Sequence, residues 1–368
     1  MSLRVAIVAP TLEILGGHSV QAAALLDGWQ GDAGDVDAWL VPINPAPPAW
    51  LAGAARVRYV RTLVTQIAYW PLLWRELRRA DVVHVFSASY TSFLLSPLPA
   101  WLVARAFGKP VLLNYHSGEA DDHLRRSRLA RAVLRRVGPT IVPSRFLVDV
   151  FARFRLAAEA IPNIIDRERF RFRPRERLRP RLLSTRNFEA NYNVACTLRA
   201  FARVQARHPD ATLTVIGSGS QAASLQEQAA SLGLRGVTFT GRVAPADMAR
   251  YLDEADIYLQ TPAVDNMPLS VLEAFSSGLP VISTDAGGVR TMLTHDVHGL
   301  LAPLDDDAAV ADNICRLLEE PGLGARLAAA ARRETDACVW DAVRDRWAAA
   351  YARLVRPSLA AVAAPEHP

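Results

Sequence analysis

Short apolar runs alternate with longer segments of helical periodicity along the whole chain. In the first half the runs are Arg4–Ala9, Val36–Val41, Val57–Val60, Asp81–Phe86, Pro110–Tyr115 and Thr140–Pro143. In the second half they are Leu182–Thr185, Thr212–Ile216, Val237–Thr240, Ile257–Gln260 and Pro280–Ser283. Each run has the length of one strand, and the segments between the runs have the length of helices. This alternation predicts an α/β fold in which helices cover parallel sheets.

One segment interrupts the alternation. Residues Arg167–Arg181 read RERFRFRPRERLRPR, with an arginine at every second position. Like charges repel and proline interrupts regular structure, so the segment is predicted to link two domains rather than to enter a core. A chain of 368 residues suits two domains of ordinary size. The predicted boundaries are 1–166 for the first domain, 167–181 for the linker, 182–339 for the second domain, 340–356 for a last helix and 357–368 for a disordered tail.

The basic residues are almost all arginines, since Lys109 is the one lysine among 42 basic residues, and the formal net charge is +5. A second arginine-rich segment, His123–Val137, contains Arg125, Arg126, Arg128, Arg131, Arg135 and Arg136 and no acid. Its apolar residues recur at helical spacing, which predicts an amphipathic basic helix. The Arg125–Arg136 face would either rest on an anionic membrane surface or be an ordinary solvated surface. No aromatic stacking platform accompanies these arginines, so we expect no nucleic-acid partner.

No apolar run is long enough to cross a membrane, so we expect a cytoplasmic protein that is either free or peripheral on the inner face of the cell membrane. The cysteines, Cys196, Cys315 and Cys338, are scattered and lack CxxC spacing. They predict neither a disulfide framework nor a zinc site.

The most informative segment is Thr261–Val281, which reads TPAVDNMPLSVLEAFSSGLPV. A strand is predicted to end near Gln260 and a helix to begin near Leu269. Asp265 would then lie in the loop before the helix, and Glu273 on its second turn. The first N–H groups of a helix lack intrahelical partners, and the helix dipole is positive there. Such a loop suits an anion flanked by hydroxyl groups, and a sugar diphosphate has that shape.

This segment resembles the acidic E-x7-E signature of the retaining glycosyltransferases of family 4, which have the GT-B fold. Here Asp265 replaces the first glutamate, and Glu273 keeps the second position. The resemblance implies two Rossmann-like, doubly wound parallel-sheet domains that face each other across a cleft. It also implies that Asp265 contacts the transferred sugar and that Glu273 binds the nucleotide ribose. The backbone that would hold the sugar hydroxyls and the diphosphate belongs to Asn266, Met267, Leu269 and Ser270, since Pro268 has no N–H.

Two further features of the first domain match the family. By this resemblance Gly16 and Gly17 form a glycine-rich loop that touches the donor diphosphate. His116 follows a strand and would contact the donor sugar. Without the resemblance, the glycines would be only a turn and His116 only a structural histidine.

The second domain carries the remaining matches. Arg186 resembles the arginine that grips the diphosphate, and a planar guanidinium suits phosphate. The family commonly has a lysine five residues later, where this chain has Asn191 followed by Tyr192, so Tyr192 or another arginine would have to take its place. Four residues in two strand-to-helix turns would line the nucleotide pocket, namely Gly217, Gly219, Arg242 and Val243.

The implied reaction is transfer of a sugar from a nucleoside diphosphate donor to a hydroxyl group of a glycan or lipid-linked acceptor. Asp265, His116 and Arg186 would be the catalytic residues, and no metal or cofactor is expected. Asp305–Asp307 contains a D-x-D, but helix capping explains these acids. Two other functions stay open, a sugar-nucleotide isomerase of GT-B fold such as a 2-epimerase and a catalytically silent sugar-nucleotide binding protein.

Overall fold

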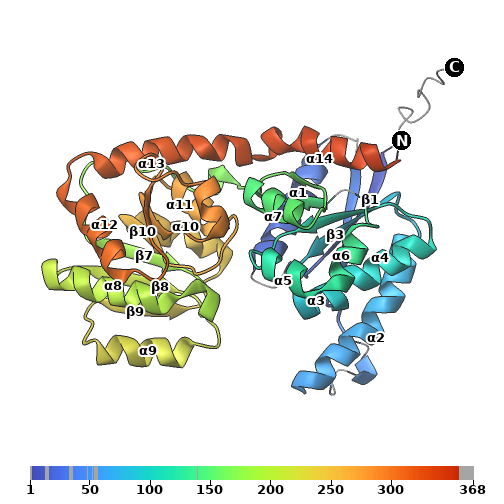
Figure 1. Ribbon diagram of the computed structural model, residues 1–368, viewed down its shortest axis with the longest axis horizontal. Coiled ribbons are helices and arrows are strands. Elements are labelled where there is room, and N and C mark those ends of the chain that lie inside the picture. The colour runs from blue at the N-terminus through green and yellow to red at the C-terminus, as the bar shows by residue number, and fades with distance from the viewer. Residues whose placement is uncertain are drawn as a thin grey trace. The chain divides into compact units, whose positions relative to one another are not determined.

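The computed structural model describes residues 2–12, 16–32, 36–47, 49–51, 53, 57–138 and 140–355, so the predicted tail 357–368 lies outside the described residues. The chain divides into two compact units (Figure 1). The first unit comprises Met1–Ile164 and Trp340–Pro368, and the second comprises Ile165–Val339. Each unit contains one six-stranded sheet, and all recorded strand pairs are parallel. The predicted α/β class is therefore confirmed.

The sheet of the first unit has the strand order β2-β1-β3-β4-β5-β6. Its strands are β1 (Leu3–Ala9), β2 (Val36–Pro42), β3 (Val82–Ser87), β4 (Val111–Tyr115), β5 (Thr140–Val142) and β6 (Ala158–Ala160). Successive side chains of a strand point to opposite faces of the sheet. Accordingly Ala6 and Val8 enter one hydrophobic core, while Val5 and Ile7 enter the other. Such sheets need helices on both faces.

The helices of the first unit are α1 (Gly17–Gly31), the short 3-10 helix η1 (Ala49–Leu51), α2 (Arg58–Leu77), α3 (Tyr90–Leu95), α4 (Pro97–Ala106), α5 (Ala120–Arg126), α6 (Arg128–Leu134), α7 (Arg145–Arg153) and α14 (Trp340–Val355). The last helix, α14, comes from the far end of the chain and packs against α1, β3 and β4. A side chain at Gly28 of α1 would overlap the ring of Trp340. Glycine at this position therefore allows the close contact between α1 and α14.

The sheet of the second unit has the order β12-β11-β10-β7-β8-β9. Its strands are β7 (Arg181–Thr185), β8 (Thr212–Ile216), β9 (Val237–Gly241), β10 (Ile257–Gln260), β11 (Val281–Thr284) and β12 (Leu300–Ala302). Its helices are η3 (Arg167–Arg169), η4 (Ala190–Tyr192), α8 (Val194–Arg207), α9 (Ala222–Ser231), α10 (Pro245–Glu254), α11 (Leu269–Ser276), η5 (Gly287–Thr291), α12 (Asp307–Glu319), α13 (Leu323–Glu334) and η6 (Thr335–Cys338). Chain order leads outward from the central strand β7 to β8 and β9 on one side, and then returns to β10 on the other. Ligands of such sheets bind at this reversal, beside the carboxyl ends of the strands.

The structure differs from the predicted elements in three respects. The predicted strand Val57–Val60 is wrong, because Arg58–Leu77 forms α2 and the run belongs to its helical pattern. The strands β6 and β12 were not predicted, since each has only three residues. The predicted basic helix His123–Val137 is two helices, α5 and α6, because Ser127 ends the first and caps the second by accepting a hydrogen bond from the Ala130 N–H.

The arginine-rich segment Arg167–Arg181 was predicted as a linker, but the structure places it inside the second unit. Three of its arginines, Arg173, Arg175 and Arg179, surround the fully buried carboxylate of Asp256. Arg175 is itself buried and donates hydrogen bonds to the carbonyls of Leu252, Ala255 and Ser277. Burial lowers the pKa of Arg175 to about 10. The charge run therefore neutralises a buried acid rather than bridging two domains.

Candidate functional site

In the second unit, the reversal of strand order lies between β7 and β10, and the predicted site residues gather there. Arg186 directly follows β7, while Asp265 lies in the loop after β10. Nη2 of Arg186 donates to Oδ2 of Asp265 at 2.5 Å, and both side chains are largely buried. The topology therefore brings together two residues that are 79 positions apart.

The guanidinium of Arg186 is held on several sides. Nη1 donates to Oγ of Ser270 at 3.2 Å, and the guanidinium carbon lies 4.2 Å from the centre of the Tyr192 ring. Burial alone would lower the pKa of Arg186, but the carboxylate of Asp265 and neighbouring groups raise it above its ordinary value. Its buried Nε has no hydrogen-bond partner among the described residues. A buried donor without a partner is costly, so this nitrogen is suited to an added acceptor.

Tyr192 contributes its ring rather than a charge. Its face lies against Arg186 as a cation–π contact, which orients the guanidinium. The neighbouring Asn191 accepts a backbone hydrogen bond from Ala263, 2.8 Å away, and so ties this segment to the loop after β10. The position of the family's lysine is that of Asn191, and which group takes over its role stays a prediction.

The helix α11 begins at Leu269, as predicted, and places Ser270 beside Arg186. Its N-cap is Pro268, which makes no side-chain cap. The first N–H groups of a helix have no intrahelical partner, and the dipole adds positive potential. A permanently charged arginine and a helix N-terminus without a side-chain cap therefore lie side by side.

The loop before α11 is fixed by its own hydrogen bonds. Oδ1 of Asp265 accepts from the N–H of Asn266 at 2.9 Å, and the carbonyl of Asp265 accepts from the N–H of Gly288 at 3.1 Å. A side chain at Gly288 would overlap the backbone of Asn266. Met267 and Leu269 pack partly buried against the hydrophobic core. The N–H of Asn266 is thus already used within the loop.

The turns after β8 and β9 reach the same region. A side chain at Gly217 would overlap the carbonyl oxygen of Arg186, and one at Gly219 would overlap that of Phe188. Arg242 follows β9 and donates from Nε to Oγ of Ser218 at 2.7 Å, while Val243 packs partly buried against the core. Glycine at the first turn therefore permits the β8 turn to lie directly against the segment that carries Arg186.

Glu273 lies on the second turn of α11, as predicted, and is partly buried. Removal of water raises the pKa of its carboxyl group to about 7, and the positive charge of Arg169 opposes this shift. A carboxyl group with this pKa changes charge near neutral pH. It is therefore poised to gain or lose a proton when a ligand with hydroxyl groups binds.

The corresponding region of the first unit is different. Its strand order reverses between β1 and β3, and α1 begins there with Gly16 as N-cap and Gly17 as first residue. Both glycines are exposed, and a side chain at either would meet nothing within 4 Å. These glycines are therefore not required by packing.

His116 directly follows β4, as predicted, and stacks on Phe86 with ring centres 5.3 Å apart. The sequence analysis missed His18, whose ring lies 5.3 Å from that of His116. Burial lowers the pKa of His18 to about 4 and that of His116 well below its ordinary value. Both imidazoles are therefore neutral at pH 7. The Nε2 atom of His116 is buried without a hydrogen-bond partner among the described residues.

The acids Asp305–Asp307 are engaged at the start of α12. Asp306 accepts a hydrogen bond from the N–H of Ala309 at 2.9 Å, which is the predicted cap. Asp305 and Asp307 form ion pairs with Arg199, and Asp307 also pairs with Arg203.

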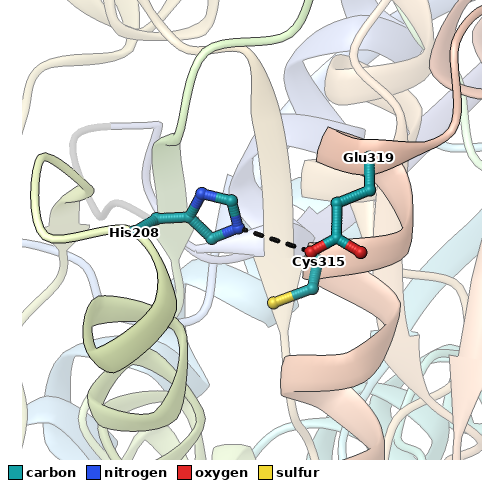
Figure 2. A group of neighbouring side chains, drawn as sticks. All are labelled: His208, Cys315 and Glu319. Carbon is teal, nitrogen blue, oxygen red and sulfur yellow. Dashed lines mark ion pairs between the residues drawn. The ribbon is translucent and has the colours of Figure 1, made fainter.

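Another group with metal-ligating side chains is His208, Cys315 and Glu319 (Figure 2), whose ligand atoms lie within 4.8 Å of one another. Glu319 is already paired with Arg207 at 2.7 Å. His208 follows the C-terminus of α8, whereas Tyr192 lies just before its N-terminus. Since α8 is about 21 Å long, the group is separate from the Arg186 site.

Comparison with known proteins agrees with this arrangement. The family model described as Glycosyltransferase Family 4 matches residues 15–169, and that described as Glycosyl transferases group 1 matches residues 166–334. This chain belongs to the family 4, group 1 glycosyltransferases. The two matches overlap at residues 166–169 and together span residues 15–334, which include parts of both units.

The relatives align with different shares of this chain. The phosphatidyl-myo-inositol mannosyltransferase of Mycolicibacterium smegmatis is 25% identical over 367 residues, which cover 93% of this chain and 91% of the relative. The alpha-monoglucosyldiacylglycerol synthase of Streptococcus pneumoniae is 28% identical over 259 residues, which cover 62% of this chain and 57% of that enzyme. This chain thus spans little more than half the length of the second relative.

Solved structures share the fold. Sucrose-phosphate synthase from Thermosynechococcus elongatus has a TM-score of 0.76 at 19% identity, with 97% of this chain and all of that chain covered. Anabaena Alr3699/HepE in complex with UDP and glucose has a TM-score of 0.73 at 15% identity, with 96% and 100% covered. The predicted GT-B fold is therefore confirmed.

Proposed function

We propose that this glycosyltransferase moves a sugar from a nucleoside diphosphate donor to a hydroxyl group of a glycan or lipid-linked acceptor. The transfer would retain the anomeric configuration and need no metal or cofactor. The observation that carries the proposal is the buried Arg186 beside the N-terminus of α11. A cation and a helix dipole together would stabilise the negative charge of the leaving diphosphate.

Asp265 supports this proposal from the sugar side. Its carboxylate is largely buried and bound by Arg186, so its position beside this arginine is fixed. As the diphosphate departs, positive character develops at the anomeric carbon, and a nearby carboxylate favours that charge. The proton of the acceptor hydroxyl would pass to the leaving phosphate. No metal is needed for this step, because Arg186 and the α11 N-terminus supply the positive charge.

His116 and His18 would position the sugar as neutral groups. Their lowered pKa values keep both imidazoles uncharged at neutral pH. A neutral imidazole has one N–H donor and one acceptor, which matches a sugar hydroxyl. In this proposal Gly16 and Gly17 offer backbone N–H groups to the diphosphate. The convergence of both units on one diphosphate stays a prediction.

The relatives favour a role in the cell envelope. One is named for a lipid that receives mannose, phosphatidyl-myo-inositol, and another for a glycolipid product, alpha-monoglucosyldiacylglycerol. A third, from Mycobacterium tuberculosis, is named glycogen synthase and is 28% identical over 293 residues. We therefore propose a glycan or lipid-linked acceptor and a cytoplasmic enzyme peripheral on the inner membrane face.

The test is a nucleotide-release assay with UDP-glucose and GDP-mannose as donors and lipid or glycan extracts as acceptors. We expect release that depends on the acceptor, a product of the same anomeric configuration by proton NMR, and unchanged rates in a metal chelator. If a donor binds but no nucleotide is released with any acceptor, the protein would be a catalytically silent binding protein. If the sugar of the donor is altered in the absence of an acceptor, the protein would be a sugar-nucleotide isomerase.

A further inference from the structure

A stripe of large apolar side chains runs along the exposed side of α2. Val60, Leu63, Ile67, Trp70 and Trp74 follow one another at spacings of three and four. Their exposed fractions are 38%, 64%, 46%, 37% and 48%. Residues at this spacing lie on one side of a helix. We call these five residues the α2 stripe.

The α2 stripe is distinct from the face of α2 that packs into the hydrophobic core. Tyr69, Leu73 and Leu77 are fully buried and pack into the first unit. The helix therefore has one apolar face for the fold and a second apolar face that its own unit leaves exposed. Large exposed apolar stripes on folded proteins mark interaction surfaces. In Figure 1, α2 extends beyond the other helices of its unit.

The charges beside the stripe indicate the partner. The helix α2 and the two residues after it contain five arginines, at positions 58, 61, 75, 78 and 79. The one acid among them, Glu76, is buried and paired with Arg75 and Arg79. Arg61 and Arg78 are exposed and form no ion pair among the described residues, so the described solvent side of α2 carries apolar residues and two free basic residues without an exposed acid.

We infer that the α2 stripe is the surface by which this protein lies on an anionic membrane. Leucine, isoleucine and tryptophan would enter the boundary between headgroups and acyl chains, and Arg61 and Arg78 would contact anionic lipid headgroups. The helix lies on the membrane and does not cross it. Among the described residues, no helix is long and apolar enough to cross a membrane. The inference rests on the proposed function in one respect. The proposed function includes peripheral attachment to the membrane, and the inference names the surface that makes this attachment.

A second copy of the chain fits this surface less well. A symmetric pairing of two α2 helices would place Arg61 of one copy near Arg75 or Arg78 of the other, and like charges would repel. The Arg125–Arg136 segment also fits a membrane less well. Arg125 and Arg126 pair with Asp121 and Asp122, and Arg131 and Arg136 donate to backbone carbonyls.

The test is flotation of the full chain with vesicles of phosphatidylglycerol and phosphatidylcholine, without donor or acceptor. The test variant is Leu63→Gln with Ile67→Gln. The matched control is Leu129→Gln on α6, where the leucine is 49% exposed and lies among the other arginines. We expect the α2 variant to lower the partition coefficient at least about tenfold and the control to change it less than about twofold. Vesicles of phosphatidylcholine alone should bind the wild type more weakly.

Two further measurements separate a loss of membrane binding from misfolding and from a loss of sugar transfer. The thermal shift produced by a nucleotide sugar should be the same in the α2 variant as in the wild type. Brominated acyl chains should quench tryptophan fluorescence in the wild type, and less so in Trp70→Phe with Trp74→Phe. Equal flotation of the α2 variant and the wild type would overturn the inference, as would a lack of quenching. A change from dimer to monomer without a change in flotation would assign the stripe to a second copy. None of these outcomes depends on sugar transfer, which the release assay measures separately.

Discussion

The two units share an architecture but differ in the chemistry at the point where their strand order reverses. In the second unit that point holds an ion pair, Arg186 with Asp265, packed against a helix N-terminus. In the first unit it holds two neutral histidines and two exposed glycines. One reversal is therefore built to neutralise a strong anion, and the other to offer hydrogen bonds without charge.

The glycines show the same contrast. Gly217 and Gly288 touch the backbone of the loops that hold Arg186 and Asp265, so the second site is fixed by close packing. A side chain at Gly16 or Gly17 would meet nothing within 4 Å. Rigid placement is what electrostatic stabilisation of a leaving group requires, because a misplaced charge loses much of its effect. In the proposed function, this contrast favours the second unit as the main binding site of the diphosphate.

The largest expected effect is that of Arg186→Gln. The change removes the buried cation and leaves Asp265 without its partner, so we expect kcat/KM for nucleotide release to fall about 100- to 1,000-fold. The matched control is Arg199→Gln, whose ion pairs with Asp305 and Asp307 are partly exposed in the same unit. It should change the rate less than about twofold. Equal effects of the two substitutions would remove the special role of Arg186.

The glycines allow a second comparison, measured by denaturant unfolding. Gly217→Ala should destabilise the protein by about 2–4 kcal/mol, because its methyl group would overlap the Arg186 carbonyl oxygen. Gly17→Ala should change stability by less than about 1 kcal/mol, since nothing lies near it. Similar costs at the two positions would show that the two sites are packed alike.

The histidines predict a pH effect on stability. The pKa of His18 falls from an ordinary 6.5 to about 4, so the unfolded chain takes up a proton that the folded chain does not. Stability should therefore be full above about pH 6.5 and decrease as the pH falls toward 4, by on the order of 3 kcal/mol. His18→Gln should reduce this slope in melting experiments. An unchanged slope would indicate that His18 is protonated in the folded state.

Glu273 predicts the smallest effect, on donor affinity. Its carboxyl has a pKa of about 7, raised from 4.5, and the ionised form accepts hydroxyl hydrogen bonds better. Affinity for a nucleotide sugar should fall about five- to tenfold between about pH 7.5 and 6. Calorimetry of Glu273→Gln should show little dependence on pH in this range. The same raised pKa means that folding loses stability as the pH rises from 4.5 through 7. A pH dependence that survives in Glu273→Gln would place the titrating group elsewhere.

The sequence predicted much of the fold because strand periods and turns are local signals. It also predicted the start of α11 at Leu269, since Pro268 and the following apolar run lie side by side in the chain. It placed Arg186 and His116 at strand ends for the same reason. Their proposed roles rest on the family resemblance and stay predictions.

Contacts between residues far apart in the chain could not be predicted from the sequence pattern. The run Arg167–Arg181 reads as a linker because the acid that binds it, Asp256, lies 77 positions from Arg179. His18 was missed because it lies on α1, whereas its neighbour His116 follows β4 much later in the chain. The single helix predicted over His123–Val137 ends early because Ser127 caps a new one, and a serine inside a helical pattern is a weak signal.

The most direct test of the central claim is hydrogen–deuterium exchange of the full chain with and without a nucleoside diphosphate sugar. If the second unit holds the diphosphate, the strongest protection should fall on three of its segments, Thr185–Arg186, Gly217–Ser220 and Leu269–Glu273. Smaller changes should appear near His18 and His116. Protection confined to the first unit, or spread over α9 and α12 with none at Leu269–Glu273, would contradict the account.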